Sequence, residues 1–170
     1  GDVLIENNHF KRCSNSSVFI PGFPSSWYES GRVQNIVIRN NLFENFGLGG
    51  GNAAVIKSIG YRANLHEKIQ PPFYYHKNVV FENNTINTFG RLLVRAISLD
   101  NFRFVGNQIN KSTKYPVVAS KSGPSFMLDR CKDVIIENNE YNWGNKATIQ
   151  AKETIGLSLK NNKNIEIIKK

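Results

Sequence analysis

The stretch Asn78-Val79-Val80-Phe81-Glu82-Asn83-Asn84-Thr85-Ile86 decides the fold, because the chain repeats it in altered form. Recognisable copies occupy residues 2–10, 35–43, 101–109 and 133–141, and a shortened copy occupies residues 164–168. A unit that recurs at this scale along a chain is the mark of a solenoid. The repeat therefore takes precedence over any isolated motif.

Each copy alternates apolar and polar residues with a period of two, as Val79 and Phe81 illustrate. This alternation predicts a short strand with one buried face. The strand runs into Asn83 and Asn84, and asparagine both tolerates the left-handed conformation and hydrogen-bonds its own backbone, so a turn is expected there. Ile86, two places further on, returns the chain to the interior.

The spacing of the copies indicates how large one turn of the solenoid is. Successive copies, counted between first strand residues, are 33, 43, 23, 32 and 31 residues apart. At about 3.3 Å per strand residue, the shortest interval holds three short strands and their bends, which is one rung of a parallel β-helix. Rungs stacked about 4.8 Å apart would place one asparagine per rung at a single corner, where side-chain amides can bond along the stack. These residues are Asn8, Asn41, Asn84, Asn107 and Asn139.

We therefore predict an all-β fold, a right-handed parallel β-helix of about five rungs that forms one domain over residues 1–170. A leucine-rich repeat would show a Leu-rich consensus and a helical period, which are not present. A propeller or a sandwich would also contain short strands, but not one recurring strand-Asn-Asn-apolar unit. Because no amphipathic cap precedes the first rung, we expect the chain to be a piece of a longer β-helix. Open rung ends would also permit self-association.

Composition bounds the class of protein. The 170 residues are 40% hydrophobic and carry a formal net charge of +9. No run of about 18 apolar residues occurs, so no membrane span is predicted. The dense basic cluster is confined to 160–170 and lacks interleaved aromatic residues, so we expect no nucleic-acid partner. Cys13 and Cys131 would lie three rungs, or roughly 14 Å, apart, which is too far for a disulfide.

Three stretches are longer than a bare rung requires. Extra residues occupy 21–34 and 59–77, which follow the second clear strand of their rungs, and 111–123, which precede that strand. The first two stretches should leave the same corner of adjacent rungs and pack together as one wall. Because binding residues concentrate in loops on a regular scaffold, this wall is the primary candidate for a functional site.

The two loops that share a corner combine aromatic and hydrogen-bonding residues. Trp27, Tyr28 and Glu29 lie in the first loop, and Arg62 and His66 lie in the second. One interpretation is that the aromatic residues only pin the loops to the flank of the β-helix. The other is that the aromatic faces bind sugar rings, whose axial hydrogens form an apolar surface. On the second interpretation an oligosaccharide or polysaccharide is the partner, and Trp27, Tyr28, Arg62 and His66 bind it.

A column of outward residues is expected beside this wall. If the apolar residues of the second clear strand point inward, then Lys57, Arg95 and Asp129 point outward and stack. Lys57 and Arg95 are then further candidates for substrate binding. The alternative is a ladder of surface charges that neutralise one another.

Glycoside hydrolysis needs two carboxyl groups, separated by about 5–5.5 Å or about 6.5–9.5 Å depending on stereochemistry. Glu29 and Asp129 are the catalytic candidates, although three rungs separate their anchors by roughly 14 Å. Pairing of Glu29 with Glu67 of the neighbouring loop is geometrically easier. The histidines show no ligand spacing and no acidic cluster suits calcium, so we expect neither a metal nor another cofactor.

One stretch resembles a known family. The run Ile20-Pro21-Gly22-Phe23-Pro24-Ser25-Ser26-Trp27-Tyr28-Glu29-Ser30-Gly31-Arg32-Val33, followed by Asn35 to Phe43, is similar to the C-terminal β-helix part of bacterial alpha-1,3-galactosidases (glycoside hydrolase family 110) and their uncharacterised relatives. The resemblance is clearest over residues 1–90. It implies a secreted or periplasmic, inverting, metal-independent α-galactosidase whose main carboxylates precede this chain. Trp27 and Glu29 would then line the cleft or contact substrate.

Three functions are compatible with the sequence. The first is a piece of a carbohydrate-active β-helix protein, an α-galactosidase-like glycoside hydrolase that acts on glycan non-reducing ends, with this piece supplying the cleft wall and substrate contacts. As an isolated piece it would be inactive if the carboxylates precede it. The second is a non-catalytic glycan-binding module, and the third is a structural solenoid segment.

Overall fold

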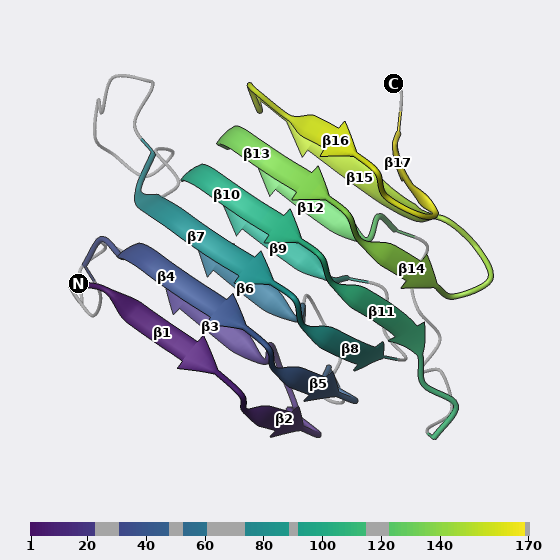
Figure 1. Cartoon of the computed structure of the whole chain (residues 1–170). Helices are drawn as coiled ribbons and strands as arrows, with labels where there is room; N and C mark the ends of the chain where they lie inside the picture. Colours follow the sequence, from purple (N-terminus) through teal and green to yellow (C-terminus); the bar gives the residue numbers. More distant parts are fainter. Residues whose placement is uncertain (23–30, 48–52, 61–73, 89–91, 115–122, 169–170) are drawn as a thin grey trace.

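The structure is a computed structural model, and it describes residues 1–22, 31–47, 53–60, 74–88, 92–114 and 123–168. Its regular structure consists of seventeen strands arranged in three parallel sheets (Figure 1). The described residues contain no helix that is long and apolar enough to cross a membrane.

The first sheet holds the strands predicted from the repeat. Its order is β1 (Val3–Glu6), β4 (Gln34–Arg39), β7 (His76–Glu82), β10 (Leu99–Val105), β13 (Lys132–Glu137) and β16 (Ser158–Lys160). The second sheet contains β2 (His9–Lys11), β5 (Leu42–Glu44), β8 (Thr85–Thr88), β11 (Gln108–Lys111) and β14 (Glu140–Asn142). The third contains β3 (Val18–Pro21), β6 (Ile56–Ile59), β9 (Val94–Ile97), β12 (Phe126–Asp129), β15 (Ala147–Lys152) and β17 (Ile165–Ile167).

Each rung takes one strand from each sheet in turn. Every strand pairs in parallel with its counterpart one rung away, and the first strand residues of the copies align, as Ile36 with Val79 and Val79 with Phe102. Parallel crossovers of this kind are right-handed because of the twist of the strands. The predicted right-handed parallel β-helix is confirmed. The described residues form five complete rungs and a sixth with strands in the first and third sheets.

The last copy of the repeat was assigned to the wrong sheet. Residues 164–168 were expected to continue the first sheet, but Ile165 pairs with Ala147 of β15 in the third sheet. The sixth strand of the first sheet is β16, which pairs with β13. The run Leu157-Ser158-Leu159-Lys160-Asn161-Asn162 carries the same alternation and the same Asn-Asn turn as the other copies. An Asn followed by alternating apolar residues does not distinguish one corner from another, whereas the Asn-Asn pair does.

A row of stacked aromatic rings runs through the interior. Phe10, Phe43, Phe81 and Phe104 stack in sequence, with centroid distances of 4.8, 5.3 and 5.2 Å. Phe126 meets Phe104 edge to face at 5.2 Å. Offset stacking and edge-to-face contacts are the favourable geometries for such rings. The stack therefore joins the rungs along the axis through the same residues that define the repeat.

The corner between the first and second sheets, here called the asparagine corner, is regular. The second asparagine of each Asn-Asn pair bonds to its counterpart in the next rung, from Asn8 through Asn41, Asn84, Asn107 and Asn139 to Asn162. Asn84 is 1% exposed; its Oδ1 accepts bonds from the backbone and side-chain nitrogens of Asn41, and its Nδ2 donates to Ile38 O and Asn107 Oδ1. All four of its side-chain bonds are thereby made inside the protein.

The first asparagine of each pair has a backbone role. Asn7, Asn40, Asn83, Asn138 and Asn161 adopt φ values between 52° and 58°, and Gly106 takes the same place with φ 66°. Asparagine and glycine are the residues that enter this left-handed region most readily. The two asparagines therefore have different roles: the first turns the chain, and the side chain of the second hydrogen-bonds to the neighbouring rungs.

The two cysteines are free, as their separation predicted. Cys131 is fully buried, and burial is the main cause that raises the pKa of its thiol to about 11. Its Sγ lies 3.6 Å from the carbonyl oxygens of Ala96 and Asp129. A thiol held in this way is a packing residue, because thiolate formation is suppressed.

Candidate functional site

The corner between the third and first sheets, here called the loop corner, is where two of the inserted stretches begin and end. β3 ends at Pro21 and β4 begins at Gln34, while β6 ends at Ile59 and β7 begins at His76. Both connections thus run from the third sheet to the first in adjacent rungs. The third inserted stretch begins after Lys111 of β11 and reaches β12 of the third sheet, at a different corner.

The predicted site residues divide into two groups. Trp27, Tyr28, Glu29, Arg62 and His66 lie outside the described residues, and so does most of each inserted stretch. Their roles stay predictions. Lys57, Arg95 and Asp129 lie in β6, β9 and β12 of the third sheet, on the half-buried positions that alternate with buried ones. The alternation confirms that these three side chains face outward.

The predicted column of three is corrected in one position. Lys57 aligns with Arg95, but the residue of β12 aligned with Arg95 is Met127. Asp129 aligns instead with Ile97 and with Lys152. Strand β12 has two outward positions, and the alignment of Phe126 with Val94 sets the register, which places Asp129 two residues nearer the loop corner.

Phe19 completes the column at its other end, and the sequence prediction missed it. It aligns with Lys57, the residue is 48% exposed, and Lys57 Nζ lies 5.1 Å from the ring centroid. The contact has the geometry of a cation–π interaction. The alternation of buried Val18 and Ile20 around an aromatic residue was the signal that could have identified it. Gln150 of β15 aligns with Met127. We call Phe19, Lys57, Arg95, Met127 and Gln150 the third-sheet column.

Two cations follow one another in this column. Burial lowers the pKa of Lys57 below its ordinary value, and the neighbouring Arg95 guanidinium lowers it further. Both causes oppose the charged ammonium. An aromatic face beside two adjacent cations is suited to a polar ligand that has both an apolar face and oxygen acceptors, which describes a sugar ring.

Asp129, the last residue of β12, forms an ion pair with the residue that follows it, Arg130. Its Oδ1 lies 3.4 Å from Arg130 Nε, and its side chain is 22% exposed. The order β3-β6-β9-β12 puts three rung spacings between Asp129 and the strand from which the stretch containing Glu29 departs. The described residues therefore place one of the two carboxyl candidates, at the loop corner and beside the third-sheet column.

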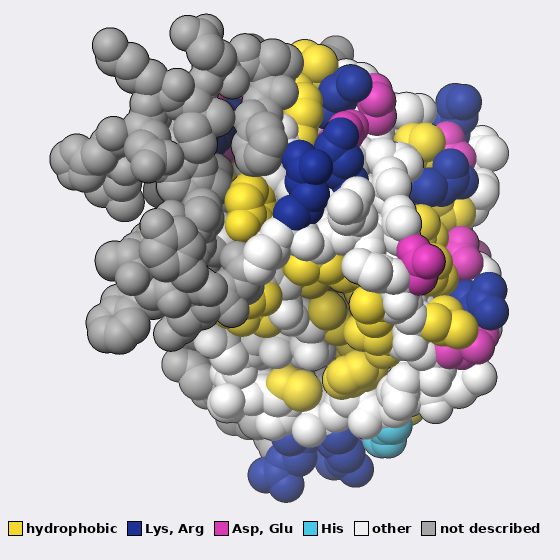
Figure 2. Space-filling model, turned by 90° about the vertical axis from the view of Figure 1, so that its left-hand side faces the viewer, with side chains coloured by type: hydrophobic (Ala, Val, Ile, Leu, Met, Phe, Trp, Pro, Cys, Tyr) yellow, Lys and Arg dark blue, Asp and Glu magenta, His cyan; other side chains and the backbone are white. Residues whose placement is uncertain are grey.

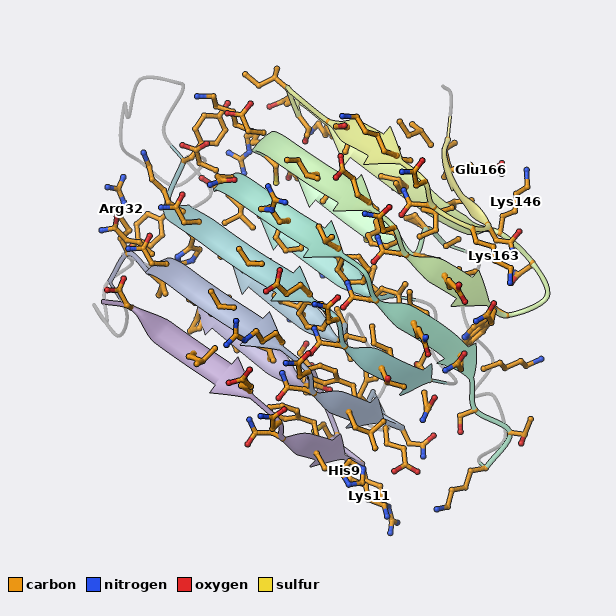
Figure 3. The ribbon with its side chains drawn as sticks, viewed as in Figure 1. His9, Lys11, Arg32, Lys146, Lys163 and Glu166 are labelled. Atoms are coloured by element: carbon orange, nitrogen blue, oxygen red, sulfur yellow. The ribbon has the colours of Figure 1, made fainter. Side chains whose placement is uncertain are left out.

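The described ends of the two inserted stretches contact one another. Arg32 Nε donates to Tyr75 O at 3.0 Å, and Arg32 Nη2 donates to Tyr74 O at 3.4 Å. Figure 3 shows Arg32 at this corner, on the opposite side of the molecule from Lys146, Lys163 and Glu166. Figure 2 views the molecule from the side on which Arg32 lies. This face presents an apolar area with separate groups of Lys and Arg side chains around it. Within the described part of the chain, no three His, Cys, Asp or Glu side chains are grouped to hold a metal ion.

Comparison with known proteins gives one consistent set of relatives, and no family model matches the chain. An alpha-1,3-galactosidase B of Akkermansia muciniphila is 33% identical over 138 residues, which is 81% of this chain and 17% of that protein. An alpha-1,3-galactosidase B of Bacteroides thetaiotaomicron is 33% identical over 144 residues, 82% of this chain and 22% of its own length. An alpha-1,3-galactosidase A of Bacteroides fragilis is 30% identical over 139 residues, 82% of this chain and 22% of its own length. The chain thus corresponds to about a fifth of each of these relatives.

Proposed function

The chain resembles a portion of the bacterial alpha-1,3-galactosidases, and from this relationship we propose that it is part of a carbohydrate-active β-helix protein with α-galactosidase-like glycoside hydrolase activity. The sequence identity, which extends over more than four fifths of the chain, is the observation that carries the proposal. The substrate is a glycan with an α-linked galactose at its non-reducing end. The protein is secreted or periplasmic, as an enzyme that acts on external glycans must be.

The part assigned to this chain is the cleft wall and the substrate contacts. The third-sheet column supports this role, because the half-exposed ring of Phe19 offers a stacking surface and Lys57 and Arg95 offer donors to sugar hydroxyl groups. Trp27, Tyr28, Arg62 and His66 belong to the stretches that start and end beside the column. Glu29 and Asp129 are the carboxyl groups proposed to assist the chemistry.

Binding and turnover are measured separately to test this proposal. Isothermal titration of the chain with an α-1,3-galactosyl oligosaccharide should give saturable binding, which Phe19→Ala and Lys57→Met each weaken by about tenfold, the loss of roughly 1.4 kcal/mol expected for an aromatic or cationic contact. Leu4→Ala is the control for the first variant, since Leu4 is 57% exposed on the first sheet. Arg103→Met is the control for the second, because Arg103 is an exposed cation on the first sheet.

Galactose release is assayed on the same substrate with this chain and with longer polypeptides that contain it. Release that depends on Glu29 or Asp129 supports the hydrolase. Binding without release from any of these polypeptides would replace it by the second candidate, a non-catalytic glycan-binding module. Absence of binding, or equal weakening by the two controls, would overturn the proposed role of the third-sheet column.

A further inference from the structure

His76 is a buried polar residue that the proposed function does not use. It is the first residue of β7, its exposed fraction is 0%, and it lies at the loop corner. A buried imidazole requires partners for both ring nitrogens, because an unpaired buried polar group costs free energy. Its partners therefore indicate what it does.

The two partners fix its protonation state. The backbone N–H of Val33 points at His76 Nδ1 at 3.2 Å, and His76 Nε2 lies 3.4 Å from the carbonyl oxygen of Ile59. An N–H group can only donate, so Nδ1 must be the unprotonated acceptor. The ring proton is then on Nε2, where it faces Ile59 O. The structure therefore holds the neutral imidazole in a single tautomer.

These partners belong to the ends of both inserted stretches. Val33 lies near the end of the first stretch and Ile59 begins the second. Tyr75 lies near the end of the second stretch and meets the His76 ring edge to face at 5.0 Å. The beginning of the first stretch is also in contact, since a Cβ added to Gly22 would lie 2.6 Å from His76 Nε2 and 2.5 Å from the Tyr75 ring. All four ends thus converge on one imidazole, and we call this set of contacts the His76 joint.

The groups around the ring disfavour a second proton. Arg32, which bonds to Tyr75 O, is the nearby cation of the first stretch. Lys77 follows His76 in β7 and pairs with Asp100 of β10 at 3.5 Å, and the phenol of Tyr75 packs against the ring. On the third sheet, Ser98 contributes carbonyl and hydroxyl oxygens that accept from the Tyr75 amide at 2.9 and 3.0 Å. None of these described groups presents a carboxylate that is not already paired to a cation.

Protonation would break the joint at a defined bond. It places a proton on Nδ1, so that two donors face each other and the Val33 amide loses its acceptor. Burial lowers the pKa of His76 below 6.5 as the largest cause, the Arg32 charge lowers it further, and the bond to Ile59 opposes both. An unfolded chain therefore binds more protons than the folded one below pH 6.5. Stability contributed by neutral His76 is complete above that pH and is lost as the pH falls toward its folded pKa.

We propose that His76 is the positioning residue of the loop corner, whose neutral imidazole ties together the ends of both inserted stretches, so that saccharide binding beside them requires the deprotonated ring. The saccharide part rests on the proposed function. The joint itself rests on the four converging chain ends and on the two bonds of the imidazole.

Two measurements separate the parts of this inference. In ¹⁵N NMR of the whole chain, His76 should show a protonated Nε2 and an unprotonated Nδ1 at pH 7.5. The Val33 amide resonance should shift on acidification together with the imidazole nitrogens of His76, at a pH below the ordinary pKa of a histidine. A ring that titrates at its ordinary value while the Val33 amide stays unchanged would overturn the joint. This result does not depend on any ligand.

The second measurement is the affinity for an α-1,3-galactosyl oligosaccharide between pH 5 and pH 7.5. The affinity of the wild type should fall several-fold at the acidic end. His76→Gln supplies one donor and one acceptor without a titrating proton, so it should bind at pH 7.5 and lose the pH dependence. His9→Gln should keep the wild-type profile, because His9 lies in the second sheet and pairs with Glu44.

Each outcome bears on one claim. A pH profile unchanged in His76→Gln would contradict the role of His76 in binding even if the NMR result holds. No binding at any pH would contradict the proposed function, and the NMR measurement would still test the joint. His76→Ala removes both bonds and should weaken binding at every pH; full affinity in that variant would also contradict the inference.

Discussion

The asparagine corner and the loop corner connect successive rungs by different kinds of contact. At the asparagine corner every rung supplies the same residue, and the side-chain amides from Asn8 to Asn162 bond in one continuous ladder. At the loop corner the connections differ in length from rung to rung, and one imidazole, His76, receives the ends of two of them. The stabilising side-chain contacts are therefore distributed along the asparagine corner and concentrated around His76 at the loop corner.

The difference shows how a repeating scaffold can carry an individual site. A ladder of identical bonds leaves no freedom at its corner, because an insertion would break the alignment of the amides. The opposite corner is released from that requirement, and both stretches that share a corner begin and end there. Binding residues commonly occupy loops that a rigid scaffold positions. The regular asparagine corner thus keeps the rungs aligned while the loop corner accommodates insertions.

The largest effect is expected from Asn84→Ala at the asparagine corner. The change leaves the buried Asn41 amide without its acceptor and Ile38 O without its side-chain donor. Since each unsatisfied buried group costs about 1–3 kcal/mol, the free energy of unfolding should fall by about 3 kcal/mol in urea denaturation. Asn8→Ala is the matched control in the exposed first rung, where Nδ2 donates to Glu6 O and Asn41 Oδ1. If both variants lost the same small amount, the ladder would not be the source of stability.

A smaller effect is expected from Gly60→Ala at the loop corner. A Cβ there would lie 2.8 Å from Tyr75 Cβ and 2.9 Å from Ile97 O. Because backbone must move to admit it, the free energy of unfolding should fall by about 1–3 kcal/mol. Gly31→Ala controls for the residue type, since no atom lies within 4 Å of its added Cβ. Equal unfolding curves for Gly60→Ala and wild type would show that the corner is not closely packed.

Much of the fold could be predicted from the sequence because its rules are local. Strand alternation, the Asn-Asn turn and the 23-residue rung follow from residues next to one another, and the observed register agrees with them from Val3 to Val134. The prediction failed at 164–168, where a short alternating run suits either of two sheets. It also failed for Asp129, because choosing between two outward positions of β12 requires the register of the neighbouring strand.

The site was less predictable because its contacts are distant in sequence. His76 meets Val33 across 43 residues and Ile59 across 17, and no local pattern announces such a convergence. Phe19 gains its meaning only when Lys57 is placed beside it by strand pairing. The repeat states where rungs stack, but not which side chains of inserted stretches approach each other.

The most direct test of the account is to locate saccharide binding on the whole chain by NMR titration with an α-1,3-galactosyl oligosaccharide. The account predicts that resonances of Phe19, Lys57 and Arg95 shift together with those of the loop corner, while Leu4 and Arg103 on the first sheet stay unchanged. Shifts confined to the first sheet, or no shifts at saturating sugar, would contradict it.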